Sequence, residues 1–343
     1  MTNTRRPANG SCLREVIHIL GLLFALGMAA LLIANHFLRQ TSPFITLAGT
    51  FNHLLFVAAL PLVLGLILLR TRTGFITALL IVALFLLAHP VFPPVSAVLR
   101  AGDDQPTLSA MTFNLGWYLT PPELLARTIA ETSADIVAVQ EMSAESAYVL
   151  ASELTAIYPY QILDPGTGTT GFLSKLPIIS YEWLYPPTNR PFLHVVVEHG
   201  GRPLHIFPIH FYSPGLRWSG QLPLPEGMYE ADLEEGVAYL LQQIAGISGP
   251  VVVLGDFNMS DQSHAYSAIT AVLDDSYRQA GYGLGLTFPN NVHLSRVPIP
   301  FPLVRIDYVF YSDPLRAVSA QVNCVEGQSD HCSVFVELGE SNP

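Results

Sequence analysis

The feature that most constrains the fold is a long apolar segment near the N-terminus. Residues 16–99 contain only three charged side chains, those of Arg39, Arg70 and Arg72. A helix that rises about 1.5 Å per residue needs about 20 apolar residues to cross a hydrocarbon core of about 30 Å. We therefore expect a membrane anchor within residues 1–100. Its three predicted transmembrane helices are residues 16–38, 44–69 and 75–99.

The first of these segments has one alternative interpretation, a cleaved signal peptide. Residues 16–38 form an uncharged stretch of 23 residues, which is longer than the usual apolar region of about 7–15 residues in a signal peptide. No clear small-residue cleavage site follows the stretch. A transmembrane helix is therefore the preferred interpretation.

The basic residues around the apolar segments predict the orientation in the membrane. Basic residues are retained on the cytoplasmic side. Three arginines precede the first segment, and two more lie between the second and third, namely Arg5, Arg6, Arg14, Arg70 and Arg72. The opposite side has only Arg39 and Arg100. We therefore expect the N-terminus in the cytoplasm and the C-terminal domain outside it.

The C-terminal part, residues 101–343, has an ordinary mixture of polar and apolar residues and is strongly acidic. It contains 9 Lys and Arg against 26 Asp and Glu, a formal charge of −17. Contacts to phosphate groups dominate the affinity of nucleic-acid binders, which are therefore usually basic. Nucleic acid is thus an unlikely partner.

The three cysteines are too few for a disulfide scaffold or a cysteine zinc site. Cys324 and Cys332 are able to form one disulfide in an oxidising compartment. Two small buried residues are an equally good interpretation of the pair.

Residues 101–343 alternate between short apolar runs and amphipathic stretches, which is typical of a single α/β domain. The predicted strands are residues 108–113, 136–140, 193–198, 204–210, 251–254, 304–310 and 333–338. The predicted helices are residues 122–132, 144–157, 230–245 and 263–272. Residues 212–229, rich in Gly and Pro, predict a long irregular loop.

Acidic, amide and imidazole side chains recur at the ends of these predicted strands. They are Asn114, Glu141, His210, Asp256, Asn258, Asp307, Asp330 and His331. Any one of them has an ordinary structural explanation, such as a turn, a helix cap or a buried ion pair. Together they supply hard oxygen ligands, which suit Mg²⁺ or Mn²⁺, and the proton-transfer groups that phosphoester hydrolysis requires.

The sequence resembles the endonuclease/exonuclease/phosphatase superfamily. The resemblance rests on Gly-Asp-Phe-Asn at residues 255–258, Ile-Asp-Tyr-Val at residues 306–309 and Ser-Asp-His at residues 329–331, in that order. It covers about residues 108–338. It implies a four-layer α/β sandwich with the active site at one end of two packed sheets.

The resemblance also implies roles for individual residues. Asn114, Glu141 and Asp330 look like the metal-site residues, with Glu141 as the principal ligand of a magnesium or manganese ion. Asp256 and Asn258 resemble the pair that positions the phosphate, the metal and the attacking water.

The remaining roles concern proton transfer. Asp307 resembles the carboxylate that orients His331, so His331 is the candidate general base or transition-state donor. His210 matches a second histidine found in the deoxyribonuclease I and sphingomyelinase branches, where it would act as a general acid or donate to a phosphate oxygen. The tyrosine of the exonuclease III branch has no clear counterpart here.

The segment Gly-Phe-Leu-Ser-Lys-Leu-Pro at residues 171–177 resembles a strand of the family that lies near the active site. It contains Lys175, the only lysine in the chain. A contact between Lys175 and the substrate phosphate is one interpretation, and a solvated turn residue is an equally good one.

We therefore expect a membrane-anchored, divalent-metal-dependent phosphoesterase. Because a tether confines the site to the bilayer surface, a lipid phosphate or a lipid-linked phosphate or pyrophosphate is the preferred substrate. One alternative is a tethered nuclease or a phosphatase for soluble phosphoesters. Another is a non-catalytic lipid- or protein-binding module on the same fold.

Overall fold

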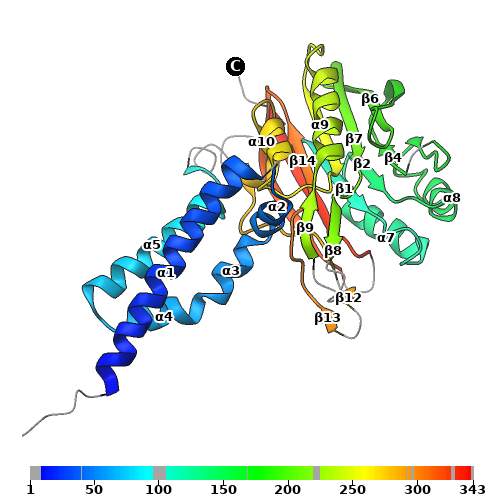
Figure 1. The fold of residues 1–343 in the computed structure, drawn as a ribbon. Helices are drawn as coiled ribbons and strands as arrows, with labels where there is room; N and C mark the ends of the chain where they lie inside the picture. Colours follow the sequence, from blue (N-terminus) through cyan, green and yellow to red (C-terminus); the bar gives the residue numbers. More distant parts are fainter. Residues whose placement is uncertain are drawn as a thin grey trace, which may run out of the picture. The chain divides into compact units, whose positions relative to one another are not determined.

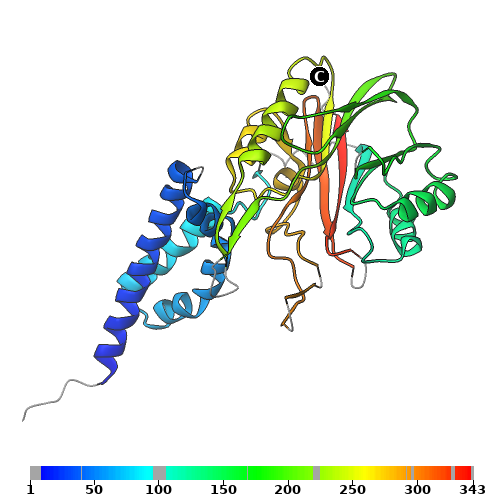
Figure 2. The same ribbon diagram turned by 45° about the vertical axis from the view of Figure 1, so that its right-hand side comes forward.

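The structure is a computed structural model, and it describes residues 9–39, 41–95, 106–167, 169–218, 225–290, 292–294, 297–325 and 329–340. The chain divides into two compact units (Figures 1 and 2). One unit comprises residues 1–90 and 217–228, and the other comprises residues 91–216 and 229–343. The expected boundary near residue 100 lies outside the described residues.

The first unit is built from helices. They are α1 (Asn9–Leu38), α2 (Pro43–Thr50), α3 (Asn52–Ala58), α4 (Leu60–Leu68) and α5 (Arg72–Ala88). Helix α1 packs against α5 and α4, with Met28, Phe56 and Leu66 among the buried side chains. Most other large apolar side chains of these helices are exposed.

The structure corrects the prediction of three membrane-spanning helices. Among the described residues, one helical stretch is long and apolar enough to cross a membrane, Cys12–Leu38. A signal sequence near an N-terminus meets the same two criteria. The predicted second span, residues 44–69, is broken near Phe51 and Ala59 into α2, α3 and α4. Helix α5 has 17 residues, which corresponds to about 26 Å and is shorter than a hydrocarbon core.

The second unit contains two six-stranded sheets. The strands of the first sheet are, in spatial order, β15 (Leu315–Asn323), β16 (Ser333–Glu340), β1 (Pro106–Asn114), β2 (Ile136–Gln140), β4 (Gly171–Ser174) and β3 (Tyr160–Ile162). Those of the second are β11 (Asp274–Asp275), β14 (Asp307–Tyr311), β10 (Val251–Asp256), β7 (Arg202–His210), β6 (Phe192–His199) and β5 (Ile178–Leu184). Among the strand pairs described in these two sheets, β1–β2 and β7–β10 are parallel and the others are antiparallel.

Helices cover the outer face of each sheet, so this unit has four layers (Figures 1 and 2). Helices α7 (Pro122–Thr132) and α8 (Ala144–Glu153) pack on the first sheet. Helices α9 (Ala231–Ile244) and α10 (His264–Thr270) pack on the second. A third apolar core fills the space between the sheets. The predicted α/β sandwich is therefore confirmed.

The smaller elements are one helix and two hairpins. They are α11 (Ser276–Ala280), β8 (Gly215–Trp218) with β9 (Pro225–Tyr229), and β12 (Val292–Leu294) with β13 (Val297–Ile299). The segment expected to be an irregular loop, residues 212–229, thus contains the β8–β9 hairpin.

The strand directions bring the expected polar residues to one end of both sheets. Asn114 is in register with Gln140 on the parallel strand β2, and His210 is in register with Asp256 on the parallel strand β10. Strand β14 runs antiparallel to β10, so Asp307 at its start lies opposite Asp256. The four parallel strands therefore end, and their antiparallel neighbours begin, at the same edge.

Gly255 lets β7 and β10 approach closely at this edge. A Cβ atom on Gly255 would lie 2.0 Å from the backbone oxygen of Ile209. We expect Gly255→Ala to lower the free energy of unfolding by about 3 kcal/mol, because overpacking would force these strands apart. Thermal unfolding of the full chain in detergent measures the change.

Gly246→Ala is the matched control for this substitution. The nearest atom to a Cβ at Gly246 is a backbone oxygen 4.0 Å away, so we expect a change within about 0.5 kcal/mol. Equal stability of the two variants would contradict a close contact between β7 and β10.

Candidate active site

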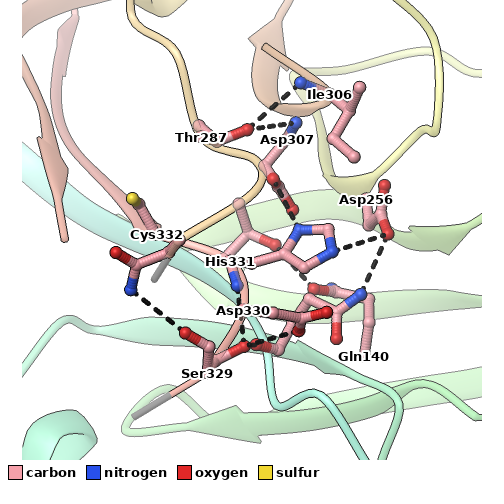
Figure 3. A network of polar contacts seen from close by, with 12 residues as sticks. Gln140, Asp256, Thr287, Ile306, Asp307, Ser329, Asp330, His331 and Cys332 are labelled. Carbon is pink, nitrogen blue, oxygen red and sulfur yellow. Dashed lines mark hydrogen bonds and ion pairs between the residues drawn. The ribbon is translucent and has the colours of Figure 1, made fainter. Parts of the chain in front are cut away.

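A buried carboxylate–imidazole pair lies at the centre of the polar cluster. The Asp307 Oδ2 atom lies 3.0 Å from the Nδ1 atom of His331. The backbone N–H of His331 donates to Ser329 Oγ, and that hydroxyl donates to the backbone oxygen of Asn114. Figure 3 shows the His331 ring between the carboxylates of Asp307 and Asp256. The ring is thus held with its Nε2 atom facing Asp256, 3.9 Å away.

Electrostatics favour the protonated form of His331. Burial alone would lower the pKa of the imidazole, but the carboxylates of Asp307 and Asp256 outweigh that effect and raise it. The pKa of Asp256 is also raised, because the residue is buried and because Asp307 carries a like charge nearby. In this buried cluster both His331 and Asp256 therefore favour their protonated forms.

Asp256 is fixed by two amides. The Asn114 Nδ2 atom donates to Asp256 Oδ2 at 2.9 Å and so joins the two sheets. Asn258 donates its backbone N–H to Asp256 Oδ1 at 2.9 Å and its side-chain Nδ2 to Oδ2 at 3.2 Å. Asn258 reaches this position through a left-handed backbone conformation, with φ +53°.

Glu141 follows strand β2 and is more accessible than Asp256. Its side chain is 22% exposed, and its Oε1 atom lies 3.7 Å from His210 Nε2. Burial raises the pKa of Glu141, the charge of Asp330 raises it further, and His331 acts in the opposite direction. Asp330 lies against the turn after β1, where a Cβ on Gly116 would come within 2.8 Å of Asp330 Oδ1.

His210 ends strand β7 and is nearly fully buried. Its Nδ1 atom lies 2.5 Å from the hydroxyl oxygen of Thr169, and its Nε2 atom lies 3.9 Å from Asp256 Oδ2. Burial first, and then the positive charges of Arg190 and His331, hold its pKa well below the usual range. A neutral imidazole is better suited to hydrogen bonding than to acting as a charged acid.

Arg190 is a cation of the site that the sequence patterns did not identify. Its guanidinium Nη1 atom contacts both ring nitrogens of His210, at 2.8 Å for Nδ1. The guanidinium also stacks on the half-exposed ring of Tyr212, 4.8 Å from the ring centroid. Such a group is suited to binding a phosphate oxygen.

Asn189 holds Arg190 and Tyr212 in place. Its buried Oδ1 atom accepts hydrogen bonds from the backbone N–H groups of both residues, at 2.9 Å and 2.8 Å. Its Nδ2 atom donates to the backbone oxygen of Asp232 on α9. Gly236 leaves room for this amide, because a Cβ there would lie 2.7 Å from Asn189 Nδ2.

The structure does not bring Lys175 to this cluster. Its Nζ atom lies 3.0 Å from Ser133 Oγ and 3.6 Å from Asp135 Oδ1. Asp135 precedes β2, whereas Glu141 follows it, so Lys175 lies at the opposite end of the strand. Lys175 is a structural residue here, and Arg190 provides the cation near His210.

The donor set fits a divalent cation. Four carboxylates gather at one edge, those of Glu141, Asp256, Asp307 and Asp330, and two of them have raised pKa values. The Oδ1 atom of Asp307 is buried without a hydrogen-bond partner. Ligand atoms of Asp256, Asp307 and His331 lie within 4.8 Å of one another. A bound cation would neutralise this excess of negative charge.

A disulfide lies beside His331. Cys324 and Cys332 are bonded to each other, so the disulfide is the correct interpretation of this pair. The Cys332 backbone N–H donates to the backbone oxygen of Thr287, and the Thr287 hydroxyl accepts from the N–H of Asp307. The segment carrying Asp330 and His331 is therefore held on both sides.

Comparison with known proteins identifies the family of the chain. The profile of the Endonuclease/Exonuclease/phosphatase family matches residues 111–331. The chain belongs to the endonuclease/exonuclease/phosphatase family. Members of this family are generally phosphoester hydrolases, and they typically depend on a divalent metal. No curated protein matches the sequence.

Solved structures share the fold of the second unit, which is called the catalytic unit from here on. A family protein from Leptotrichia buccalis has 19% identity and a TM-score of 0.50, with 67% of this chain and 99% of that chain covered. The endonuclease/exonuclease/phosphatase from Bacteroides vulgatus has 19% identity, a TM-score of 0.52 and coverages of 68% and 99%. Truncated TDP2 of Caenorhabditis elegans has 15% identity, a TM-score of 0.52 and coverages of 68% and 97%.

We expect Asn189→Ala to lower kcat/KM for a chromogenic phosphoester about tenfold, mainly through KM. The reason is that Arg190 and Tyr212 lose the acceptor that fixes their backbone, and a lost hydrogen bond of this kind is worth about 1 kcal/mol. Gly236→Ala should have the same effect without removing any polar group, because its methyl group displaces Asn189. Steady-state kinetics and thermal unfolding are measured together on each variant.

Asn323→Ala, at an exposed position on β15, is the control and should behave as the unmodified protein. Normal KM values in folded Asn189→Ala and Gly236→Ala would show that Asn189 does not position Arg190.

Proposed function

We propose that this family member is a divalent-metal-dependent phosphoesterase that hydrolyses a lipid phosphate, or a lipid-linked phosphate or pyrophosphate, at a membrane surface. The main support for the proposal is a cluster of two carboxylates and two imidazoles. Glu141 and Asp256 face His210 and His331, and the pKa values of the two imidazoles are shifted in opposite directions. This arrangement offers carboxylates for a cation and two donors for a phosphate within a few ångströms.

Glu141, with Asp330 and the side-chain oxygen of Asn114, is the set that would hold the cation. These are hard oxygen ligands, which magnesium and manganese prefer. Asp307 is assigned to His331 instead, because its Oδ2 atom is hydrogen-bonded to that ring and only its buried Oδ1 atom has no partner. Bound there, a divalent cation would supply positive charge to the phosphoryl oxygens and would lower the pKa of the attacking water.

The protein's own groups divide the remaining work. Asp307 keeps the proton on His331 Nδ1 and stabilises the imidazolium, so His331 Nε2 can exchange a proton with the water or donate to the phosphoryl group. Asp256, held by Asn114 and Asn258, orients the water. His210 remains neutral and donates to a phosphate oxygen.

Arg190, rather than Lys175, binds the substrate phosphate. It binds a second phosphate oxygen as a fixed donor and adds positive charge where negative charge develops in the transition state.

The preference for a lipid substrate is supported by charge and by the N-terminal helix. A net charge of −17 over residues 101–343 disfavours a polyanion such as nucleic acid. The helical stretch Cys12–Leu38 is long and apolar enough to cross a membrane. An anchored enzyme meets lipids at a high local concentration, which favours them over soluble phosphoesters.

We further propose that the N-terminus lies in the cytoplasm and the catalytic unit outside it. A single crossing by α1 gives the same sidedness as the three crossings expected from the sequence. Arg5, Arg6 and Arg14 before the helix favour this orientation. The Cys324–Cys332 disulfide suits an oxidising compartment.

Glu141→Gln should lower turnover of lipid phosphate at least a hundredfold, because the substitution removes the charge of the principal metal ligand. EDTA should abolish the activity of the unmodified protein, and Mg²⁺ or Mn²⁺ should restore it. Phosphate release from lipid in detergent micelles measures both effects.

Glu153→Gln, at an exposed position at the end of α8, serves as the control and should keep full activity. Metal-independent turnover, or full activity in Glu141→Gln, would refute the proposed metal role.

Cys12 provides a test of sidedness because it is a free, exposed cysteine at the start of the apolar helix. We expect a membrane-impermeant maleimide to label Cys12 only after the cells are permeabilised. Cys12→Ser gives the background signal. Labelling in intact cells would place the N-terminus outside and reverse the proposed orientation.

A further inference from the structure

A pocket lies beside the turn that follows Asn114. It has a volume of about 310 Å³ and is lined by the turn after β1, the first turn of α7 and the first turn of α8. Its lining includes Trp117, Tyr118, Leu119, Glu123 and Glu145. No residue of the catalytic cluster is among those that line it.

The pocket is continuous in the chain with the two loops that hold the proposed metal ligands. Trp117 lies three residues after Asn114, and Ser143, which also lines the pocket, lies two residues after Glu141. Gly116 lies between Asp330 and the pocket, because a Cβ there would come within 2.8 Å of Asp330 Oδ1 and 3.1 Å of Cδ1 of Leu119, which lines the pocket. A substrate with its phosphate at Glu141 would therefore place a neighbouring group at this pocket.

The aromatic wall is held in a conformation that has a structural cost. Trp117 has φ +53°, a left-handed conformation that bulky residues rarely adopt and that is typically retained at functional sites. Trp117, Tyr118 and Leu119 are respectively 39%, 78% and 64% exposed. Three consecutive large, exposed apolar side chains that line one pocket are characteristic of a binding surface.

The charge of the pocket selects among ligands. Glu123 and Glu145 both line it, and the described lining residues include no lysine, arginine or histidine. Carboxylates in the first turns of α7 and α8 also interact favourably with the helix ends, but that role does not explain the exposed aromatic rings. Aromatic faces together with carboxylates form the usual binding environment for an alkylated ammonium group.

We propose that this pocket binds an alkylammonium group carried by the alcohol part of the phosphoester substrate. The proposal rests on the proposed phosphoesterase function and narrows its substrate class. The phosphate occupies the cluster around Glu141 and Arg190, while the cationic end lies against Trp117 and Tyr118 between Glu123 and Glu145. A second anionic group at this position is disfavoured by the two carboxylates.

The decisive experiment compares two esters of the same shape and different charge. One is p-nitrophenyl phosphocholine, and the other is its carbon isostere, p-nitrophenyl 3,3-dimethylbutyl phosphate. We expect the full chain in detergent with Mg²⁺ to prefer the charged ester about tenfold in kcat/KM, which is the size of a partly desolvated cation–π contact. Trp117→Ala and the double variant Glu123→Gln/Glu145→Gln should each reduce the preference to below about threefold.

Tyr148→Ala is the control, because Tyr148 is an exposed aromatic residue of α8 that does not line the pocket. It should keep the full preference. Calorimetric titration with choline and with 3,3-dimethylbutan-1-ol tests binding without turnover, and only choline should bind to the unmodified protein.

Equal kcat/KM values for the two esters, or equal binding of choline and its isostere, would overturn the ammonium site and leave the phosphoesterase function intact. Absence of hydrolysis of every phosphoester and lipid phosphate, with choline still bound, would instead refute the proposed function alone. If Trp117→Ala weakens binding to phosphatidylglycerol vesicles and leaves the ester preference unchanged, the aromatic turn contacts the bilayer and the proposal fails.

Discussion

The hydrogen bond between Asp307 and His331 is the interaction around which the catalytic unit is organised. Both side chains are nearly removed from water, and charged groups in such a place are stable only when they are paired. The pair is held by Ser329 and Thr287, and through them by the end of β1 and the backbone of Cys332. Asp256 adds a second carboxylate, and the two carboxylates together raise the pKa of His331. The pKa of His210, which is buried beside Arg190, is lowered instead. The two histidines therefore have different proton affinities because their neighbours differ in charge.

The sheet topology explains why residues far apart in the sequence form this arrangement. Parallel pairing of β1 with β2 and of β7 with β10 brings four strand ends to one edge. The antiparallel strands β14 and β16 start from the same edge, which places Asp307 and His331 beside the parallel ends. The hydrogen bond from Asn114 to Asp256 joins the sheets at that edge. A cluster of like charges there is unfavourable by itself, so the folded protein gains from any bound cation.

Much of the site could be predicted from the sequence, because polar residues interrupt apolar runs at strand ends. Asn114, Glu141, His210, Asp256, Asn258, Asp307, Asp330 and His331 all lie in or beside one cluster. The sequence patterns did not identify Arg190, although a signal was present. Gly200 and Gly201 form the turn between β6 and β7, and continuing the antiparallel register of these strands towards His210 leads to residue 191, the neighbour of Arg190. Lys175 was expected near the site because it adjoins a strand that leads there. Sheet register shows that it follows the end of β4 that lies away from Glu141, and the sequence alone does not give that register. The sequence did not show that residues 44–69 form three short helices, because the segment is uniformly apolar and nothing in its composition marks the breaks at Phe51 and Ala59. Thr169 gave no signal, because loop geometry alone brings it to His210.

In the proposed site Glu141 holds the cation, while Asp307 and His331 remain free to transfer protons. Anomalous diffraction from crystals of the full chain grown with Mn²⁺ tests this division of roles most directly. We expect one manganese ion bound to the Glu141 carboxylate, with the Asp307–His331 hydrogen bond intact. An ion ligated instead by Asp256, Asp307 and His331, or no ion at Glu141, would contradict this expectation.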